Sequence, residues 1–185
     1  LWAVYEKQNT LTAVTTLSPQ EIDHTEQFGQ SVAQTQDGAA AFVGSPRYGF
    51  ADSTGLEIGG VYTYTRAQTT AYQPITPIAG QDAIITVNRD GVRGLGYSVT
   101  AGQLDWAAAG APSSLNGAGA AQGGYALVIY RDTAGYVPGG LPYVAWQLLT
   151  TPNDATNDTG RFGHCVTMSL DERWLYVGAP NDNEV

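Results

Sequence analysis

The sequence predicts an all-β protein made of four-stranded antiparallel sheets, and three observations carry this prediction. Glycine is frequent, with 23 residues in 185, and short runs rich in Val, Ile, Thr and Tyr lie between Gly, Pro, Asn and Asp. Such runs are typical of strands joined by tight turns. A set of short motifs also recurs along the chain at a nearly constant spacing. No segment has apolar residues repeating every 3.6 positions, so no long helix is expected.

The composition is that of a folded, acidic chain. Charged residues make up 14% of it, against about 25% in ordinary soluble domains, and 43% of residues are apolar, which argues against disorder. The net charge of −9 gives a surface that repels phosphate backbones, so no nucleic-acid partner is expected. No run approaches the roughly 20 apolar residues of a membrane span, and we expect no membrane insertion. With Cys165 as the sole cysteine, no intramolecular disulfide is possible.

The first recurring motif opens each unit of the chain. It begins at residues 28, 95 and 162 and reads FGQSV, LGYSV and FGHCV, so that 67 residues separate each start from the next (95 − 28 and 162 − 95). A second motif follows each time and reads VGSP, AGAP and VGAP at residues 43–46, 109–112 and 177–180. Internal repetition of this kind is the sequence signature of repeat architectures.

Two further motifs complete the unit. The third is GGVYTY at 59–64 and GGYALVIY at 123–130, and the opening WAVY at 2–5 is similar to its tail. The fourth is looser and precedes each Phe/Leu-Gly; it is LTAVTTLSP at 11–19, AIITV at 83–87 and AWQLLTTP at 145–152. Each motif is short and β-prone, so each unit predicts four strands.

The spacing inside a unit fits paired strands. From Val32 to Val43 is 11 residues (43 − 32), which fits two strands of about five joined by a tight turn. The predicted turns are Asp37-Gly38 in the first unit, Gly102-Gln103 in the second and Asp171-Glu172-Arg173 in the third.

Four short strands per repeat is the blade of a β-propeller. A period of 67 exceeds the roughly 40–50 residues of the commonest propeller repeats, and the excess is predicted to lie in loops such as 47–58 and 113–122. The predicted organisation is one propeller-type domain, and its parts are the end of a preceding blade with a linker strand at 1–27, unit 1 at 28–94, unit 2 at 95–161 and the start of unit 3 at 162–185. A closed propeller needs four to eight blades. We therefore expect an incomplete propeller here, belonging to a longer polypeptide.

The repeated positions predict the packing between units. Small residues in the second motif allow close approach of neighbouring backbones. The predicted framework residues are Phe28, Gly29, Gly44, Pro46, Gly96, Gly110, Pro112, Phe162, Gly163, Gly178 and Pro180. Large aromatic side chains are expected to fill the space between packed units. They are Phe28, Tyr64, Tyr130, Trp146, Phe162 and Trp174.

The ordered set Phe-Gly-x-Ser-Val, an Asp-containing turn, Val-Gly-Ala-Pro and Gly-Gly-Val-Tyr-x-Tyr resembles the FG-GAP repeat, known from the α-subunit propeller of integrins and from many bacterial and phage proteins. The resemblance covers nearly the whole chain. The third unit, from Phe162 to Asn181, is most similar to repeats in very long structural proteins of tailed phages, particularly of marine cyanobacteria.

The resemblance implies a non-enzymatic structural or adhesive module of a large virion protein in a tail, fibre or capsid appendage. Its expected partners are other protein subunits and a host surface glycan or receptor, and its expected location is the virion or the cell exterior. The alternative is a cell-surface or secreted adhesion receptor module that binds protein or glycan. A glycan-active enzyme is the least favoured, because no convergent set of polar residues recurs.

Some integrin blades carry a calcium loop between their first two strands, and this sequence departs from it. Calcium takes six to eight oxygen ligands. The matching segments at 34–38, 101–105 and 169–172 read QTQDG, AGQLD and SLDE, and none has three oxygen ligands at alternate positions. No calcium site and no cofactor are therefore expected.

The remaining polar clusters have structural interpretations. His164 and Cys165 are neighbours that a strand would point to opposite faces, which argues against a nucleophile–base pair, and Cys165 is expected to be a small buried substitute for the Ser of the other units. Three loop clusters could hold a cation, and the first two could instead hydrogen-bond a sugar, but their Asn and Asp residues are also turn formers. They are Asp23, His24 and Glu26; Asn153, Asp154, Asn157 and Asp158; and Asn181, Asp182, Asn183 and Glu184. The segment 169–174 distantly resembles the Asp-box turn of sialidase-like propellers, which is itself structural.

Overall fold

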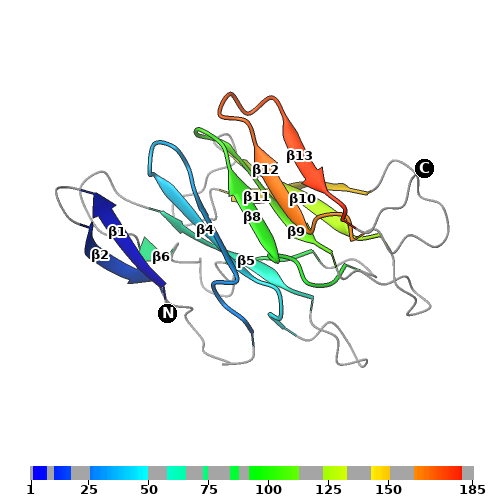
Figure 1. Ribbon diagram of the computed structural model, residues 1–185, viewed down its shortest axis with the longest axis horizontal. Helices are drawn as coiled ribbons and strands as arrows, with labels where there is room; N and C mark the ends of the chain where they lie inside the picture. The colour runs from blue at the N-terminus through cyan, green and yellow to red at the C-terminus, as the bar shows by residue number, and fades with distance from the viewer. Residues whose placement is uncertain are drawn as a thin grey trace.

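The computed structural model is all-β, and its sheets stack along the longest axis of the molecule (Figure 1). The structure describes residues 2–7, 11–17, 26–49, 58–65, 73–74, 84–87, 92–112, 123–132, 143–150 and 161–180. No helix occurs within these ranges. The predicted loop excess at 47–58 and 113–122 lies largely outside them.

The first large sheet has four strand positions, all filled from residues 28–94. Its order is β3 (Ser31–Gln34), β4 (Ala40–Ser45) and β5 (Gly60–Thr65), and the fourth position is shared by β6 (Gln73–Pro74) and β7 (Ile84–Ile85). β6 and β7 both pair with the same side of β5, at different points along it. All of these pairs are antiparallel.

The second large sheet repeats this order with four continuous strands. They are β8 (Ser98–Ala101), β9 (Trp106–Ala111), β10 (Tyr125–Arg131) and β11 (Tyr143–Leu149), each antiparallel to the next. Two smaller sheets flank the large ones: β1 (Trp2–Lys7) pairs with β2 (Leu11–Leu17), and β12 (Cys165–Met168) pairs with β13 (Leu175–Gly178).

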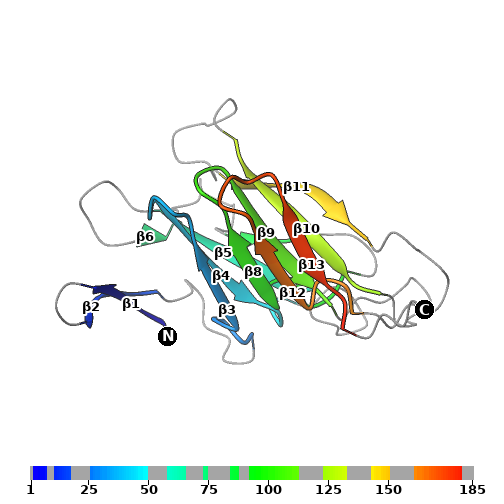
Figure 2. The same cartoon turned by 45° about the horizontal axis from the view of Figure 1, so that its top comes forward.

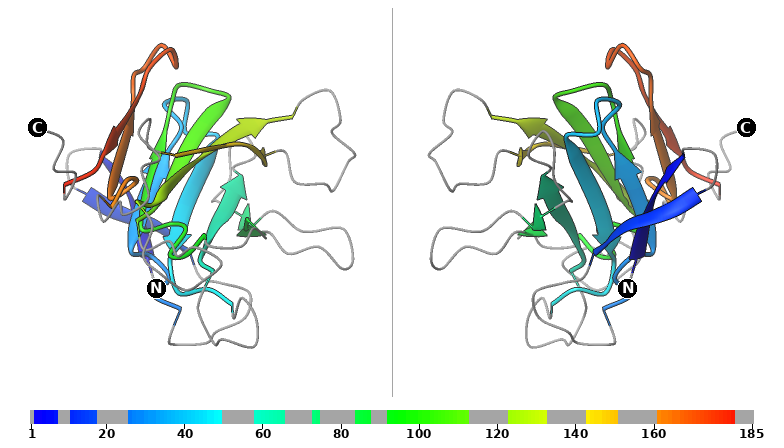
Figure 3. Two further views of the ribbon diagram at one scale, coloured as in Figure 1. Left: turned by 90° about the vertical axis from the view of Figure 1, so that its right-hand side faces the viewer. Right: turned by 90° about the vertical axis from the view of Figure 1, so that its left-hand side faces the viewer.

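The sheets follow one another in chain order. Strand β3 contacts β8, and β8 contacts β12, so the first strands of successive sheets lie next to each other. In Figures 1 and 2 the β1–β2 pair lies at one end of the molecule, and the β12–β13 pair lies alongside β8–β11. Seen from either end, the β12–β13 pair stands beside the β8–β11 sheet (Figure 3).

The main apolar core lies between the two large sheets. One sheet contributes Phe42, Val61 and Ile85, and the other contributes Leu127 and Ile129 together with small alanines of β9. Alternate residues of a strand point to opposite faces, so these side chains come from every second position of β4, β5, β9 and β10. Phe42 meets Tyr143 of β11 edge-on, with ring centroids 4.9 Å apart. Burial raises the pKa of Tyr143 to about 12, and its hydroxyl donates to the Leu104 carbonyl at 3.1 Å.

The predicted turns are present where the sequence placed them. In the first, Gly38 has φ 69°, its N–H donates to the Thr35 carbonyl, and the Asp37 carboxylate accepts from the Ala39 N–H at 2.9 Å. In the second, the Gly102 N–H donates to the Trp106 carbonyl at 2.8 Å. The third, at 169–174, joins β12 to β13.

The six aromatic residues predicted to fill the space between units differ in their surroundings. Tyr64 is buried and Phe28 packs edge-on against Tyr62 at 5.0 Å, and their apolar neighbours among the described residues all belong to the first unit. Trp146 and Trp174, however, are 63% and 64% exposed, so the prediction was wrong for them. Trp146 lies on the face of its sheet that β12 contacts, but β12 contacts β8 and β9 and leaves Trp146 of β11 exposed, which the sequence pattern alone did not show.

Candidate functional site: the surfaces between successive sheets

The closest contacts between successive sheets are backbone on backbone, at glycine. A Cβ atom built on Gly44 of β4 would lie 1.9 Å from the Gly96 carbonyl oxygen, and one built on Gly110 of β9 would lie 1.8 Å from that of Gly163. Real Cβ atoms do not approach a carbonyl so closely, so no other residue fits at either position without moving the neighbouring sheet. Gly96 and Gly163, which supply these carbonyl oxygens, lie at the start of the next unit in each case.

The glycines that supply these carbonyls adopt a backbone conformation that favours glycine. Gly29, Gly96 and Gly163 have φ of 87°, 89° and 85°. Each donates its N–H across its own sheet to the glycine of the second motif: Gly29 to Gly44 at 2.9 Å, Gly96 to Gly110 at 3.0 Å and Gly163 to Gly178 at 3.1 Å. The two glycine motifs found in the sequence therefore meet in three dimensions, once within each unit and again between units.

A serine hydroxyl strengthens each of the two contacts between units. Ser31 donates to the Gly96 carbonyl at 2.8 Å, and Ser98 donates to the Gly163 carbonyl at 3.0 Å. Cys165 holds the same position in β12 and touches Gly178, but it is exposed. The prediction of a buried cysteine was thus wrong, because no further glycine carbonyl of the described residues covers it.

Glu172 links the third unit to the turn of the second, a role the sequence analysis missed. Its Oε1 accepts from three successive backbone N–H groups, those of Leu104 at 2.6 Å, Asp105 at 3.1 Å and Trp106 at 3.4 Å. Glu172 itself has φ 58°, and its side chain lies against Gly102, where a Cβ would meet it at 2.4 Å. A carboxylate opposite a glycine turn in the preceding unit is the signal that could have pointed to this contact.

We expect Glu172→Ala to lower the free energy of unfolding by about 2 kcal/mol, because three N–H groups lose a charged acceptor. Urea denaturation followed by circular dichroism measures this change. Glu172→Gln is the control: it keeps an acceptor oxygen, so its loss should be the smaller of the two. Equal stability of Glu172→Ala and the parent chain would contradict the expectation.

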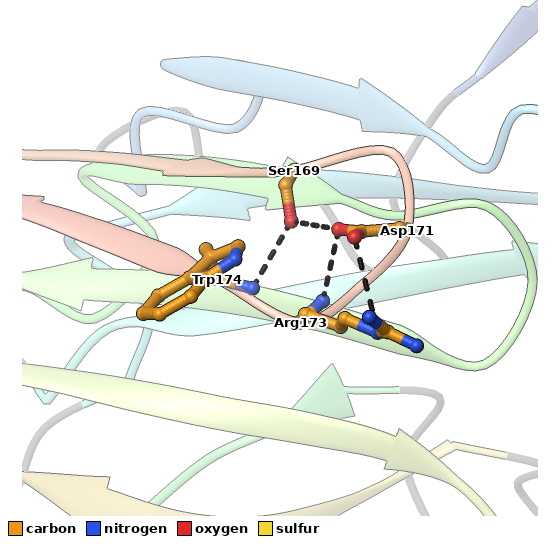
Figure 4. Close-up of polar contacts among 4 residues, drawn as sticks. All are labelled: Ser169, Asp171, Arg173 and Trp174. Carbon is orange, nitrogen blue, oxygen red and sulfur yellow. Dashed lines mark hydrogen bonds and ion pairs between the residues drawn. The ribbon is translucent and has the colours of Figure 1, made fainter.

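The β12–β13 turn is held by a compact set of polar contacts (Figure 4). Ser169 Oγ donates to Asp171 Oδ1 at 2.6 Å and accepts from the Trp174 N–H at 3.0 Å. Asp171 Oδ1 also accepts from the Arg173 N–H at 3.3 Å, while Arg173 Nε lies 3.9 Å from Oδ2. These contacts satisfy the carboxylate inside the turn, so the segment acts as a structural element of the fold.

The hydrogen bond from Ser169, followed by that from the Arg173 backbone, lowers the pKa of Asp171. A lowered carboxyl pKa in the folded state supports the turn above the pKa of a free aspartate, and this support is lost as pH falls through the lowered value. We expect Ser169→Ala to raise the pKa of Asp171, measured by NMR titration of the carboxyl carbon. An unchanged pKa would show that the serine hydroxyl is not the main cause.

His164 and Cys165 do not form a reactive pair. The His164 ring packs on Tyr97 of the preceding unit, with centroids 5.1 Å apart and Nε2 3.5 Å from the tyrosine hydroxyl. Cys165 contacts Gly178 instead. The imidazole therefore belongs to the contact between units.

Glu26 is the described member of the first loop cluster, and it binds within the fold. Its Oε2 accepts from the Tyr62 hydroxyl at 3.2 Å, and its carbonyl accepts from Ser45 Oγ at 2.8 Å. Burial and the nearby Glu26 carboxylate raise the pKa of Tyr62. The other members of that cluster, Asp23 and His24, lie outside the described residues, as do the Asn/Asp clusters at 153–158 and 181–184.

No group of three or more His, Cys, Asp or Glu side chains in the described part of the chain could hold a metal ion. In the segment matching the calcium loop, Thr35 is buried and bonds to the backbone of Ala40, and Asp37 closes its own turn. The side-chain oxygens of Thr35 and Asp37 thus take part in hydrogen bonds within the β3–β4 hairpin.

An aromatic cluster, made of Trp106, Tyr130 and Trp146, lies on the second large sheet. Trp106 and Tyr130 are direct cross-strand partners with centroids 4.5 Å apart, and Trp146 lies 6.1 Å from the first and 5.7 Å from the second. The matching partners in the first large sheet are Ala40 and Thr65, so the cluster is not part of the shared framework. Tyr130 and Trp146 are among the aromatic residues predicted from the sequence to pack between units, and Trp106 is not.

No protein-family model matches this chain, and no curated protein matches it at a significant level. Within the described residues there is also no helix of the length and apolarity that crossing a bilayer requires. The site must therefore be interpreted from its own geometry, which is that of surfaces formed for contact between successive sheets.

Proposed function

We propose that this chain is a scaffold module of the β-propeller type, whose sheets stack as blades and whose role is to build or bind rather than to catalyse. The observation that carries the proposal is the recurrence of one contact: the glycine and serine set that joins the first large sheet to the second also joins the second to β12–β13. A contact repeated from unit to unit is the property of repeat architectures, in which each unit is stabilised by its neighbours.

Four described side chains of the kinds that catalysis uses support the same proposal. Glu26, Asp171, Glu172 and His164 each contact groups that hold a turn or join two units. Catalysis needs groups aimed at a common point where a substrate can sit. These four side chains instead hold turns or join units, at separate places along the stack of sheets.

The proposed setting is a large virion protein, in a tail, fibre or capsid appendage. Its support is the likeness of the repeat motifs to those of phage structural proteins, together with a lysine-poor, acidic composition. The proposed partners are neighbouring protein subunits and, at the exposed loops, a host surface glycan or receptor, because loops on a rigid β scaffold are where binding residues gather. An adhesion receptor on a cell surface is the alternative.

Quantitative peptide mass spectrometry separates the two settings. Purified virions and cell-surface fractions from the native source are digested with trypsin, and the peptide spanning 132–161 is measured against an isotope-labelled standard. The virion proposal expects a fixed, symmetric copy number per particle. Enrichment in a membrane or secreted fraction, with none in particles, would overturn it in favour of the receptor.

A further inference from the structure

Three successive backbone N–H groups, in the turn between β8 and β9 and at the start of β9, point at a single oxygen atom. They belong to Leu104, Asp105 and Trp106, and they donate to Oε1 of Glu172 at 2.6, 3.1 and 3.4 Å. Successive N–H groups that converge in this way form a nest, a concave site for an anion. We call these three groups the β8–β9 nest. Leu104 is 42% exposed, so the nest lies within reach of solvent.

The backbone of Glu172 indicates that the carboxylate contact, and not the turn, requires a glutamate there. The N–H of Glu172 donates to the Ser169 carbonyl, as the N–H of Gly38 donates to the Thr35 carbonyl in the first hairpin. The two turns are therefore equivalent, and both residues are left-handed, with φ 58° at Glu172 and 69° at Gly38. Glycine adopts this conformation freely, whereas a glutamate in it is strained. The charge-assisted hydrogen bonds from the nest offset that strain.

The space beside the nest fits the end of a carboxylate side chain. Glu172 lies directly on Gly102, and the three atoms nearest to a Cβ built on this glycine are Cγ, Oε1 and Cδ of Glu172. A side chain at position 102 would thus occupy the volume that these atoms fill. Acetate carries the same groups, namely a methyl carbon, a carboxyl carbon and carboxylate oxygens. The nest and Gly102 together therefore match a small carboxylate in size and in charge.

We propose that the β8–β9 nest and Gly102 form a carboxylate-binding site, which Glu172 fills as a ligand supplied by the next unit. When residue 172 lacks its side chain, the site takes a free carboxylate from solution. While Glu172 is present, its attachment to the chain keeps its carboxylate at a high local concentration, so a free carboxylate competes poorly. The carboxylate site goes beyond the proposed scaffold role, which does not depend on it.

NMR titration with sodium acetate tests the site. The ¹⁵N-labelled chain carrying Glu172→Gly is used, because glycine is the residue that the equivalent turn of the first hairpin has at this position. We expect saturable shifts of the amide signals of Leu104, Asp105 and Trp106. Half-saturation is expected at about 10–100 mM, because a few hydrogen bonds to a small ion give weak binding. The parent chain should show no saturable shift at these three amides.

Two further variants locate the bound acetate. Glu172→Gln keeps a side-chain oxygen in the nest, so acetate should not shift its amides at the concentration that half-saturates Glu172→Gly. Gly102→Ala, added to Glu172→Gly, places a methyl group in the volume that acetate needs. It should weaken acetate binding by about tenfold or more.

Urea denaturation gives a second measurement. Acetate should raise the urea midpoint of Glu172→Gly and leave that of the parent chain unchanged, because a ligand stabilises only the folded chain that binds it. Glu172→Ala also vacates the nest and should bind acetate in the same range. The proposal is overturned if neither vacated variant shows saturable shifts, or if Gly102→Ala leaves the binding unchanged. Equal shifts with sodium chloride, which would reflect ionic strength alone, overturn it too.

Discussion

Gly110→Ala is expected to destabilise the protein by about 3 kcal/mol, because one methyl group forced into a packed contact costs about 1–3 kcal/mol and occasionally more. The added Cβ would lie 1.8 Å from the Gly163 carbonyl oxygen, which belongs to backbone and cannot rotate away. Relief requires the β12–β13 sheet to move off the second large sheet, which also breaks the Ser98 hydrogen bond. Urea denaturation monitored by tryptophan fluorescence gives the change in the free energy of unfolding.

Gly178→Ala is the matched control for this substitution. Gly178 holds the same place in its strand pair as Gly110, but the nearest atom to an added Cβ is the Cys165 sulfur, a side-chain atom that can turn aside. We expect a loss of about 1 kcal/mol or less, the usual size for an accessible site. Similar losses for both variants would mean that the contact between sheets is not what Gly110 protects.

Phe42→Ala is expected to cost about 4 kcal/mol, the usual loss when a buried phenylalanine is truncated and leaves a cavity. Phe42 is fully buried between the large sheets, and its ring meets Tyr143 edge-on. Truncation therefore removes apolar burial and the contact that fixes β11 against β4. Thermal and urea denaturation should both show the loss.

Val32→Ala tests whether that loss reflects the core. Val32 is in the neighbouring strand β3 but is 44% exposed, so its truncation should change stability by about 0.5 kcal/mol or less. Phe42→Leu, which keeps most of the apolar volume, should fall between the two. If Phe42→Ala were as mild as Val32→Ala, the two large sheets would not share a core in solution.

Much of the candidate site could be predicted from the sequence, because its key residues are glycines with a fixed spacing. A glycine that recurs with a constant neighbourhood indicates a backbone position where a side chain does not fit, and Gly44, Gly96, Gly110 and Gly163 are at such positions. The motif could not identify the residue that each of these glycines contacts. The contact joins Gly44 to Gly96, across two sheets, and only the stacking of the sheets brings these residues together.

Other residues carry no local signal at all. The environment of Glu172 depends on the turn of the preceding unit, 66–68 residues earlier in the chain. Trp146 looks like a core residue by composition, but it lies at a bulge in β11, and β12 contacts β8 and β9 and leaves it exposed. Exposure depends on which surfaces are covered, and a single strand does not encode what lies above it.

The sequence by itself determined the strand class, the turns and the glycine framework of this protein, since each depends on residues close together in the chain: side-chain alternation sets the faces of a strand, and glycine sets the turn. The tertiary structure decided which sheet faces are buried and where Cys165 and Trp146 lie. These depend on contacts between distant segments, which form only when the sheets stack.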